Sequence, residues 1–192
     1  MEFRKFIAKA QLLSPLLDFE LDAQPVEYRF DPLSDMPSRI NVRRAQRVRQ
    51  ARESGVDIEG FVDGTRRDCF FCPENISRST PLLPESIFGV GRITEGECVI
   101  FPNLFPFAEY HAVARITKEH YLDLDWFTEE MLRDNIKACH RWILSVYNYD
   151  LEARYPMYNW NHMPPSAASI IHPHVQVLVD KRPTPYLKMR LD

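Results

Sequence analysis

Two histidines and a glutamine alternate with apolar residues in the segment 170–180, whose sequence is IIHPHVQVLVD. Side chains two residues apart in a β-strand face the same side of a sheet. His172, His174 and Gln176 would therefore share one face, and the valines of the segment would share the other. Buried polar side chains cost about 1–3 kcal/mol each unless they are paired. We therefore predict a strand with one core side and one functional side. Pro173 cannot donate to a ladder, which places the motif at a strand start or an irregular edge.

Cys69 and Cys72 form a Cys-x-x-Cys pair within the sequence CFFCPEN. In a reducing compartment this spacing indicates metal or redox chemistry before a structural disulfide. A thioredoxin-like redox role would place the pair at the strand-to-helix junction of a βαβ unit, and the surrounding sequence does not show one. Metal binding is therefore preferred. We expect Cys98 and Cys139 to pack in the core.

The amino-acid composition is typical of a globular protein. The chain has 192 residues, of which 45% are hydrophobic and 27% charged, as expected for one globular domain with an extended arm. A formal net charge of −3 gives no reason to expect a nucleic-acid partner. Apolar runs stay well short of the roughly 18 residues that span a membrane, and the N-terminal segment lacks the apolar core of a signal peptide. We expect a cytoplasmic protein without a membrane partner.

Residues 1–68 are predicted to form an irregular N-terminal arm, since Pro25, Pro32 and Pro37 interrupt it. The segment 39–55 is rich in arginine. It is either a solvated helix or a phosphate-binding arm, because the guanidinium fork matches phosphate oxygens in two-point contacts. The arginines of this segment are Arg39, Arg43, Arg44, Arg47, Arg49 and Arg52.

Residues 69–192 are predicted to form a compact α+β domain. A helix is expected over 128–147, because its apolar residues recur every three or four positions. Thr128 or Asp125 would cap this helix, and two glutamates suit its first turn. Alternating, β-branched sequences predict the strands, which lie at 97–103, 111–117, 154–160 and 170–180.

The sequence HPHVQ resembles the His-Pro-His-x-Gln signature of the galactose-1-phosphate uridylyltransferases, a branch of the histidine-triad (HIT) superfamily. Other motifs of that family have similar counterparts here, in the same order, so that the likeness covers residues 39–180 and corresponds to a single repeat. These counterparts are RRAQR at 43–47, CFFCPEN at 69–75, IFPNLFPF at 100–107, ARITKEHYLDL at 114–124 and NHMPPSAAS at 161–169.

The resemblance implies a HIT-like α+β fold, with an antiparallel sheet of about five strands and a long packed helix. It also implies a nucleotidyltransferase in which His174 attacks the α-phosphorus of a nucleotide and forms a covalent nucleotidyl-histidine. Gln176 and Ser169 would donate hydrogen bonds to phosphate oxygens. A main-chain carbonyl at the HPH turn would hold the other ring nitrogen of the nucleophile.

The same likeness implies the remaining site residues. Substrate phosphates and nucleotide would be bound by Arg44, Arg47, Asn103, Asn161 and Ser169. A structural zinc ion would be held tetrahedrally by Cys69, Cys72, His120 and His172. His111 is the rival to His120, because it lies in the same strand region.

The sequence departs from the family pattern in two places, and these departures leave other functions open. The loop MPPSAAS contains no glycine and is equally similar to the Ser-Gly-Ala-Ser loop of dinucleoside polyphosphate phosphorylases, with Ala167 replacing glycine. Leu104 stands where the uridylyltransferases carry an acidic residue. The donor would be a nucleotide-sugar or a dinucleotide, and the acceptor would bear a phosphate. The alternatives are a phosphorylase of such substrates and a zinc-stabilised nucleotide-binding protein without turnover.

A homodimer is the expected assembly. A single repeat exposes the edge of its sheet, and an unprotected edge is a pairing site. A two-fold dimer buries such a surface with the same patch on both subunits. Arg44 and Arg47 resemble family arginines that reach phosphates across a subunit boundary. We therefore expect each arm to lean over the His174 of its neighbour.

Overall fold

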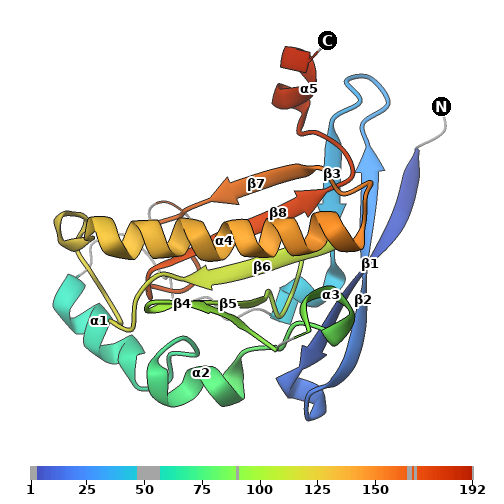
Figure 1. The fold of residues 1–192 in the computed structure, drawn as a ribbon. Coiled ribbons are helices and arrows are strands. Elements are labelled where there is room, and N and C mark those ends of the chain that lie inside the picture. Colours follow the sequence, from blue (N-terminus) through green and yellow to red (C-terminus); the bar gives the residue numbers. More distant parts are fainter. Residues whose placement is uncertain (1–3, 47–56, 90, 164–165, 167, 192) are drawn as a thin grey trace.

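The computed structural model describes residues 4–46, 57–89, 91–163, 166 and 168–191. Its architecture is α+β, with two antiparallel sheets and one long helix (Figure 1). The predicted fold class is therefore confirmed. No helix in the described ranges is long and apolar enough to cross a membrane.

The larger sheet has five strands in the order β4-β5-β6-β8-β7, and every neighbouring pair is antiparallel. Alternation along β8 separates its valines, which are buried in the main core, from Gln176, which lines a pocket on the opposite face. The five strands are β4 (Ile93–Glu95), β5 (Cys98–Pro102), β6 (Tyr110–Arg115), β7 (Tyr155–Asn159) and β8 (His174–Asp180).

Helix α4 (Glu129–Tyr149) lies along one face of this sheet (Figure 1). Its apolar stripe, which includes Trp142 and Val146, packs on β-strand side chains in the main hydrophobic core. The hydroxyl of Thr128 accepts a hydrogen bond from the backbone N–H of Met131 at 3.2 Å. Thr128, one of the two predicted candidates, is therefore the N-cap. Because α4 covers this face, the polar side chains of β8 are left for the other.

The smaller sheet has three strands in the order β1-β2-β3, and it corrects the prediction of an irregular arm. Strands β1 (Lys5–Ser14) and β2 (Glu20–Phe30) form a long hairpin, and β3 (Pro37–Ile40) pairs with the end of β2. The prolines are compatible with these strands. Pro25 pairs with Lys9 of β1 but lies outside the part of β2 that pairs with β3. On that open side of β2 a backbone N–H would have no strand partner, so proline loses no ladder hydrogen bond there.

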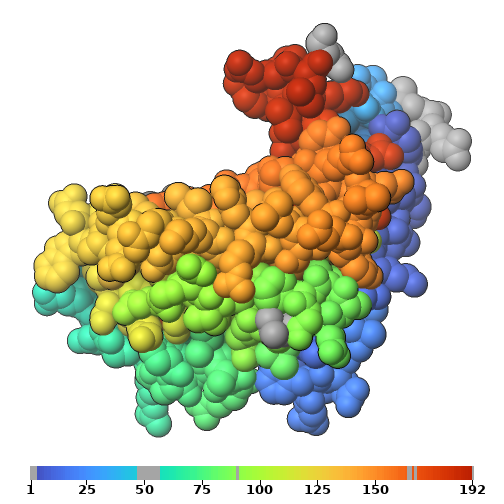
Figure 2. Space-filling view, in the orientation of Figure 1, coloured from blue at the N-terminus to red at the C-terminus, as the bar shows by residue number. Residues whose placement is uncertain are grey.

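The two sheets are joined by contacts between distant parts of the chain. Arg39 forms an ion pair of 2.6 Å with Asp180 at the end of β8, and the Tyr28 hydroxyl donates to the same carboxylate at 3.2 Å. In the space-filling view the hairpin and the C-terminal helix stand at one end of the molecule (Figure 2). The arm is therefore packed against the region that carries the polar face of β8.

Short helices lie in the connections between these elements and after β8. They are η1 (Pro15–Leu17), η2 (Val42–Gln46), α1 (Ile58–Arg66), α2 (Pro73–Ser79), α3 (Glu85–Phe88), η3 (Leu124–Trp126) and α5 (Pro185–Leu191). Helix α2 begins directly after the Cys-x-x-Cys pair, with Pro73 in its first turn, where the missing N–H costs nothing. The cysteines are thus fixed at the start of a helix.

Candidate active site and metal centre

A pocket of about 360 Å³ opens on the sheet face opposite α4. Its volume lies within the range of about 300–1,000 Å³ that is usual for small-molecule sites. The residues predicted to act on a nucleotide meet here, except Arg47, which lies outside the described residues. Those that line the pocket are Arg44, Asn103, Asn161, Ser169, His174 and Gln176.

The imidazole of His174 has a defined tautomer. Its Nδ1 lies 2.8 Å from the carbonyl oxygen of His172, and a carbonyl only accepts hydrogen bonds. Nδ1 therefore carries the proton, and the lone pair of the neutral ring is on Nε2. Burial lowers the pKa of His174, which favours this neutral form. Phe71 supports the ring edge-on, with 5.3 Å between the ring centroids.

His172 and His174 both lie beside the Phe71 ring, which packs edge-on against each imidazole. Strand β8 begins at His174, so His172 lies just before the ladder, and Pro173 between them denies the ladder a donor. The His172 side chain belongs to a group that could hold a metal ion, and its members are Cys69, Cys72, His120 and His172.

This buried group fits a tetrahedral metal. Its ligand atoms all lie within 4.8 Å of one another. The Sγ–Nδ1 distances are 3.4 Å for Cys72 and His120, 3.6 Å for Cys69 and His172, and 3.7 Å for Cys72 and His172. Zinc bonds of about 2.3 Å to sulfur and about 2.0–2.1 Å to nitrogen place S and N about 3.5 Å apart in a tetrahedron. The donor set and its spacing therefore suit one metal ion.

Partners outside the group orient the histidines. His172 Nε2 lies 2.8 Å from the Thr117 carbonyl, and His120 Nε2 lies 3.0 Å from the Thr65 hydroxyl. Both rings thereby turn Nδ1 toward the cysteines, the usual arrangement for metal-binding histidines. Burial raises the pKa of the Cys72 thiol to about 12, so a bound cation is needed to stabilise its thiolate at neutral pH.

His111 does not belong to the metal group, so its role as a rival ligand is excluded in this structure. Its ring lies under the pocket, where Nε2 is 3.0 Å from Gln176 Oε1. The N–H of Phe107 donates to its Nδ1 at 3.2 Å. The sequence signalled His111 only as a potential ligand. Its partner Gln176 comes 65 positions later, and no local pattern connects the two.

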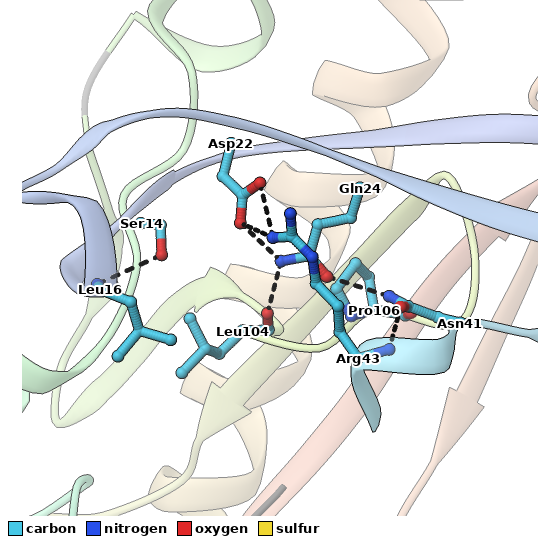
Figure 3. Close-up of polar contacts among 8 residues, drawn as sticks. All are labelled: Ser14, Leu16, Asp22, Gln24, Asn41, Arg43, Leu104 and Pro106. Atoms are coloured by element: carbon cyan, nitrogen blue, oxygen red, sulfur yellow. Dashed lines mark hydrogen bonds and ion pairs between the residues drawn. The ribbon is translucent and has the colours of Figure 1, made fainter. Parts of the chain in front are cut away.

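The pocket loop that follows β5 is held by side chains of the arm (Figure 3). The amide of Gln24 donates to the Leu104 carbonyl at 2.9 Å, and the amide of Asn41 donates to the Pro106 carbonyl at 2.8 Å. Arg44 donates to the carbonyl between them, that of Phe105. Three successive carbonyls are therefore fixed from outside the loop. Sequence reasoning missed Gln24 and Asn41, because neither belongs to a recognisable motif.

The arm side chains also bind one another. Arg43 pairs with both carboxylate oxygens of Asp22, at 2.7 and 2.8 Å. Gln24 bridges this pair to Asn41, since it donates to Asp22 at 2.9 Å and accepts from Asn41 at 3.0 Å (Figure 3). Asp22, Gln24 and Asn41 are buried. We call these four residues, Asp22, Gln24, Asn41 and Arg43, the arm network.

Arg44 lines the same pocket as the His174 of its own chain. Its guanidinium carbon lies 4.8 Å from the centroid of the Phe107 ring. Within one chain Arg44 is held at its own site, because β3 and η2 run directly beside the pocket loop. The expectation that each arm leans over the His174 of its neighbour stays a prediction.

Comparisons with known proteins agree with this fold. A solved ADP-glucose phosphorylase from Arabidopsis thaliana with bound ADP-glucose aligns with a TM-score of 0.54 and 18% identity, covering 87% of this chain and 52% of that one. A solved uridylyltransferase aligns with a TM-score of 0.54 and 16% identity, covering 85% and 48%. These likenesses confirm the predicted HIT-like fold.

In sequence, the chain is 34% identical over its whole length to a protein of uncharacterised function from Archaeoglobus fulgidus. The chain spans 54% of that relative, so it corresponds to about half of it. No family model matches the sequence.

Proposed function

We propose that the protein transfers a nucleoside monophosphate between a nucleotide-sugar or dinucleotide donor and a phosphate-bearing acceptor, through a covalent intermediate on His174. One observation carries the proposal. A neutral imidazole with its lone pair on Nε2 lines a pocket together with the hydrogen-bonding side chains of Asn103, Asn161, Ser169 and Gln176 and the cationic Arg44. The fold shared with two nucleotidyltransferases supports it.

In the first step the Nε2 lone pair of His174 forms a bond to the α-phosphorus of the donor. The bond from that phosphorus to the bridging oxygen breaks, and the leaving group takes the electron pair as a phosphate, such as a hexose 1-phosphate. The His172 carbonyl stabilises the positive charge that develops on the ring, because it accepts the Nδ1 proton in a 2.8 Å hydrogen bond.

In the second step a phosphate oxygen of the acceptor attacks the same phosphorus. The N–P bond breaks, its electrons return to Nε2, and His174 is regenerated. The side chains of Gln176 and Ser169 would donate to the non-bridging oxygens in both steps, and Arg44 would neutralise their charge. Division of one transfer into two displacements is the advantage of such a nucleophile.

The proposed metal is zinc, held by Cys69, Cys72, His120 and His172. A closed Cys₂His₂ shell is structural: it has no open position for water. When bound, the ion would anchor the start of α2 and the His172 backbone to the sheet. The chain's own contribution is then the His172 carbonyl, which keeps the proposed nucleophile in its tautomer.

We also propose that the protein is a homodimer. The outer strands of the five-stranded sheet, in the part of the chain that is described, are β4 and β7. Tyr158 in β7 and Trp160 just after it are 46% and 36% exposed. An edge flanked by exposed aromatic side chains is a suitable surface for self-association. Light scattering tests this, because a dimer has twice the 22.6 kDa mass of one chain.

The activity is tested by phosphorus NMR with ADP-glucose, UDP-glucose or a diadenosine polyphosphate as donor. Inorganic phosphate or a hexose 1-phosphate serves as acceptor. The proposal predicts a new nucleotide product for at least one pair, and turnover only when the acceptor is present. Nucleotide binding by calorimetry without turnover for any pair would favour the alternative, a zinc-stabilised nucleotide-binding protein.

A further inference from the structure

The donor and the acceptor in the contact between His111 and Gln176 can be identified. His111 is 3% exposed and lies on β6, beside β8 in the centre of the sheet. The backbone N–H of Phe107 donates to His111 Nδ1 at 3.2 Å, which occupies the lone pair of that nitrogen. In a neutral imidazole the other nitrogen then carries the proton. His111 is therefore the Nε2–H tautomer.

This tautomer determines the orientation of the Gln176 amide. His111 Nε2 lies 3.0 Å from Gln176 Oε1, so Nε2–H donates to that oxygen. The reversed amide would bring two donors together. Asn103 Nδ2 lies 3.3 Å from the same Nε2, but a protonated Nε2 cannot accept from it, and the Asn103 oxygen is already used by the Phe105 N–H at 3.0 Å.

With its oxygen bound to His111, Gln176 has only its amide nitrogen left for the pocket that it lines. We propose that His111 is a positioning residue that holds Gln176 with its NH₂ group toward the phosphate oxygens of the substrate. If the amide were reversed, its oxygen would face the anionic phosphates and repel them. The inference rests on the proposed nucleotidyl transfer, since it specifies how Gln176 can act as a donor there.

The surroundings keep His111 neutral. Burial, followed by the nearby positive charge of Arg44, lowers the pKa of His111 to about 3. A protonated ring would direct a second N–H at the Phe107 N–H and lose that contact. The Phe107 ring, with its centroid 4.3 Å from that of His111, packs against the imidazole. The orientation of Gln176 is therefore constant throughout the neutral pH range.

Two variants separate the two nitrogens of the ring. In His111→Asn the side-chain oxygen can still accept from Phe107 N–H, but the amide is too short to reach Gln176. In His111→Gln the longer amide can donate to Gln176. Loss of one donor to the transferring phosphate costs about 10²-fold in rate. We expect His111→Asn to slow adduct formation about 10- to 100-fold with little change in KM, and His111→Gln to recover most of that loss.

A double-mutant cycle distinguishes positioning from a general structural effect. If His111 acts through Gln176, His111→Asn has no further effect on adduct formation in a Gln176→Ala background, because the amide that it orients is gone. Additive losses in the double variant would overturn the proposal. Equal rates for wild type and His111→Asn would also overturn it, while the proposed function would stand.

The tautomer of His111 can be measured in the wild-type protein without an activity assay. Long-range proton–nitrogen NMR of histidine-labelled protein at neutral pH should show His111 protonated at Nε2 and bare at Nδ1. The opposite tautomer or an imidazolium would overturn the proposal. If no donor forms an adduct but the Nε2–H tautomer is found, the proposed function fails and the His111–Gln176 orientation remains.

Discussion

The Nδ1 proton of His174 is donated to the carbonyl oxygen of His172 over 2.8 Å, while the His172 side chain belongs to the buried Cys₂His₂ group. One residue thus connects the proposed metal centre to the proposed nucleophile. Its side chain contributes a ligand nitrogen, and its backbone selects the tautomer of His174. Any change that releases His172 should therefore affect stability and catalysis together.

Substitution of a metal ligand tests this coupling. We expect wild-type protein to contain one zinc ion per chain, and Cys72→Ser to lose it together with several kcal/mol of unfolding free energy, because metal binding to such a site contributes directly to folding. Elemental analysis and thermal unfolding measure both effects. Cys139→Ser is the matched control, since this buried cysteine lies outside the group. Full zinc occupancy in Cys72→Ser would refute the assigned ligand set.

Two adjacent arginines should give opposite phenotypes. Arg44 lines the pocket, whereas Arg43 pairs with Asp22 in the arm network. We expect Arg44→Ala to raise KM for the nucleotide donor about 10-fold or more, since a charge-assisted contact to phosphate is worth about 1.5–3 kcal/mol. Arg43→Ala should reduce stability with a smaller effect on KM. Steady-state kinetics and urea unfolding distinguish the two, and identical KM changes would argue against a phosphate role for Arg44.

The arm network should contribute to the stability of the pocket loop. Asn41→Ala removes the donor to the Pro106 carbonyl and to the Gln24 amide oxygen, which are then buried without partners. Each unsatisfied group costs about 1–3 kcal/mol, so we expect a loss of about 2–4 kcal/mol in urea unfolding. Ser38→Ala, on the exposed side of β3, serves as the control and should change little. A loss no greater than that of the control would exclude this contribution.

Stability should fall in mild acid because of His111. Its pKa is about 3 in the folded protein and about 6.5 in the unfolded chain, so between these values only the unfolded state binds the proton. The free energy of unfolding therefore falls as pH decreases through this window, by about 1.4 kcal/mol per pH unit for this residue. His111→Gln should have a slope shallower by that amount in urea titrations between about pH 6 and about pH 4. An unchanged slope would contradict the buried, neutral state of His111.

Local patterns predicted the parts of the fold whose residues are close in sequence. The apolar spacing of α4 and its Thr128 cap depend on neighbours three or four positions apart. The alternation of β8 likewise separated the core valines from Gln176. The Cys-x-x-Cys pair with His120 and His172 came from the family resemblance, and the structure places these four side chains together.

Long-range partnership is what the sequence did not reveal. The arm forms a sheet because β1 pairs with β2, and its buried polar residues are stable only because they meet carbonyls of a loop far along the chain. Gln24 and Leu104 are 80 positions apart, and His111 and Gln176 are 65 apart. Without these partners, Gln24 and His111 resemble ordinary polar residues in the sequence.

In the proposed mechanism His174 carries the nucleotide during transfer. Intact-protein mass spectrometry can detect this intermediate after the protein is mixed with an active donor, without acceptor and with a neutral quench. Wild-type protein should gain the mass of one nucleoside monophosphate and lose it when acceptor is added, whereas His174→Asn should gain nothing although it keeps its zinc and its fold. Turnover by His174→Asn at the wild-type rate, or an adduct of the same mass on that variant, would exclude His174 as the nucleophile.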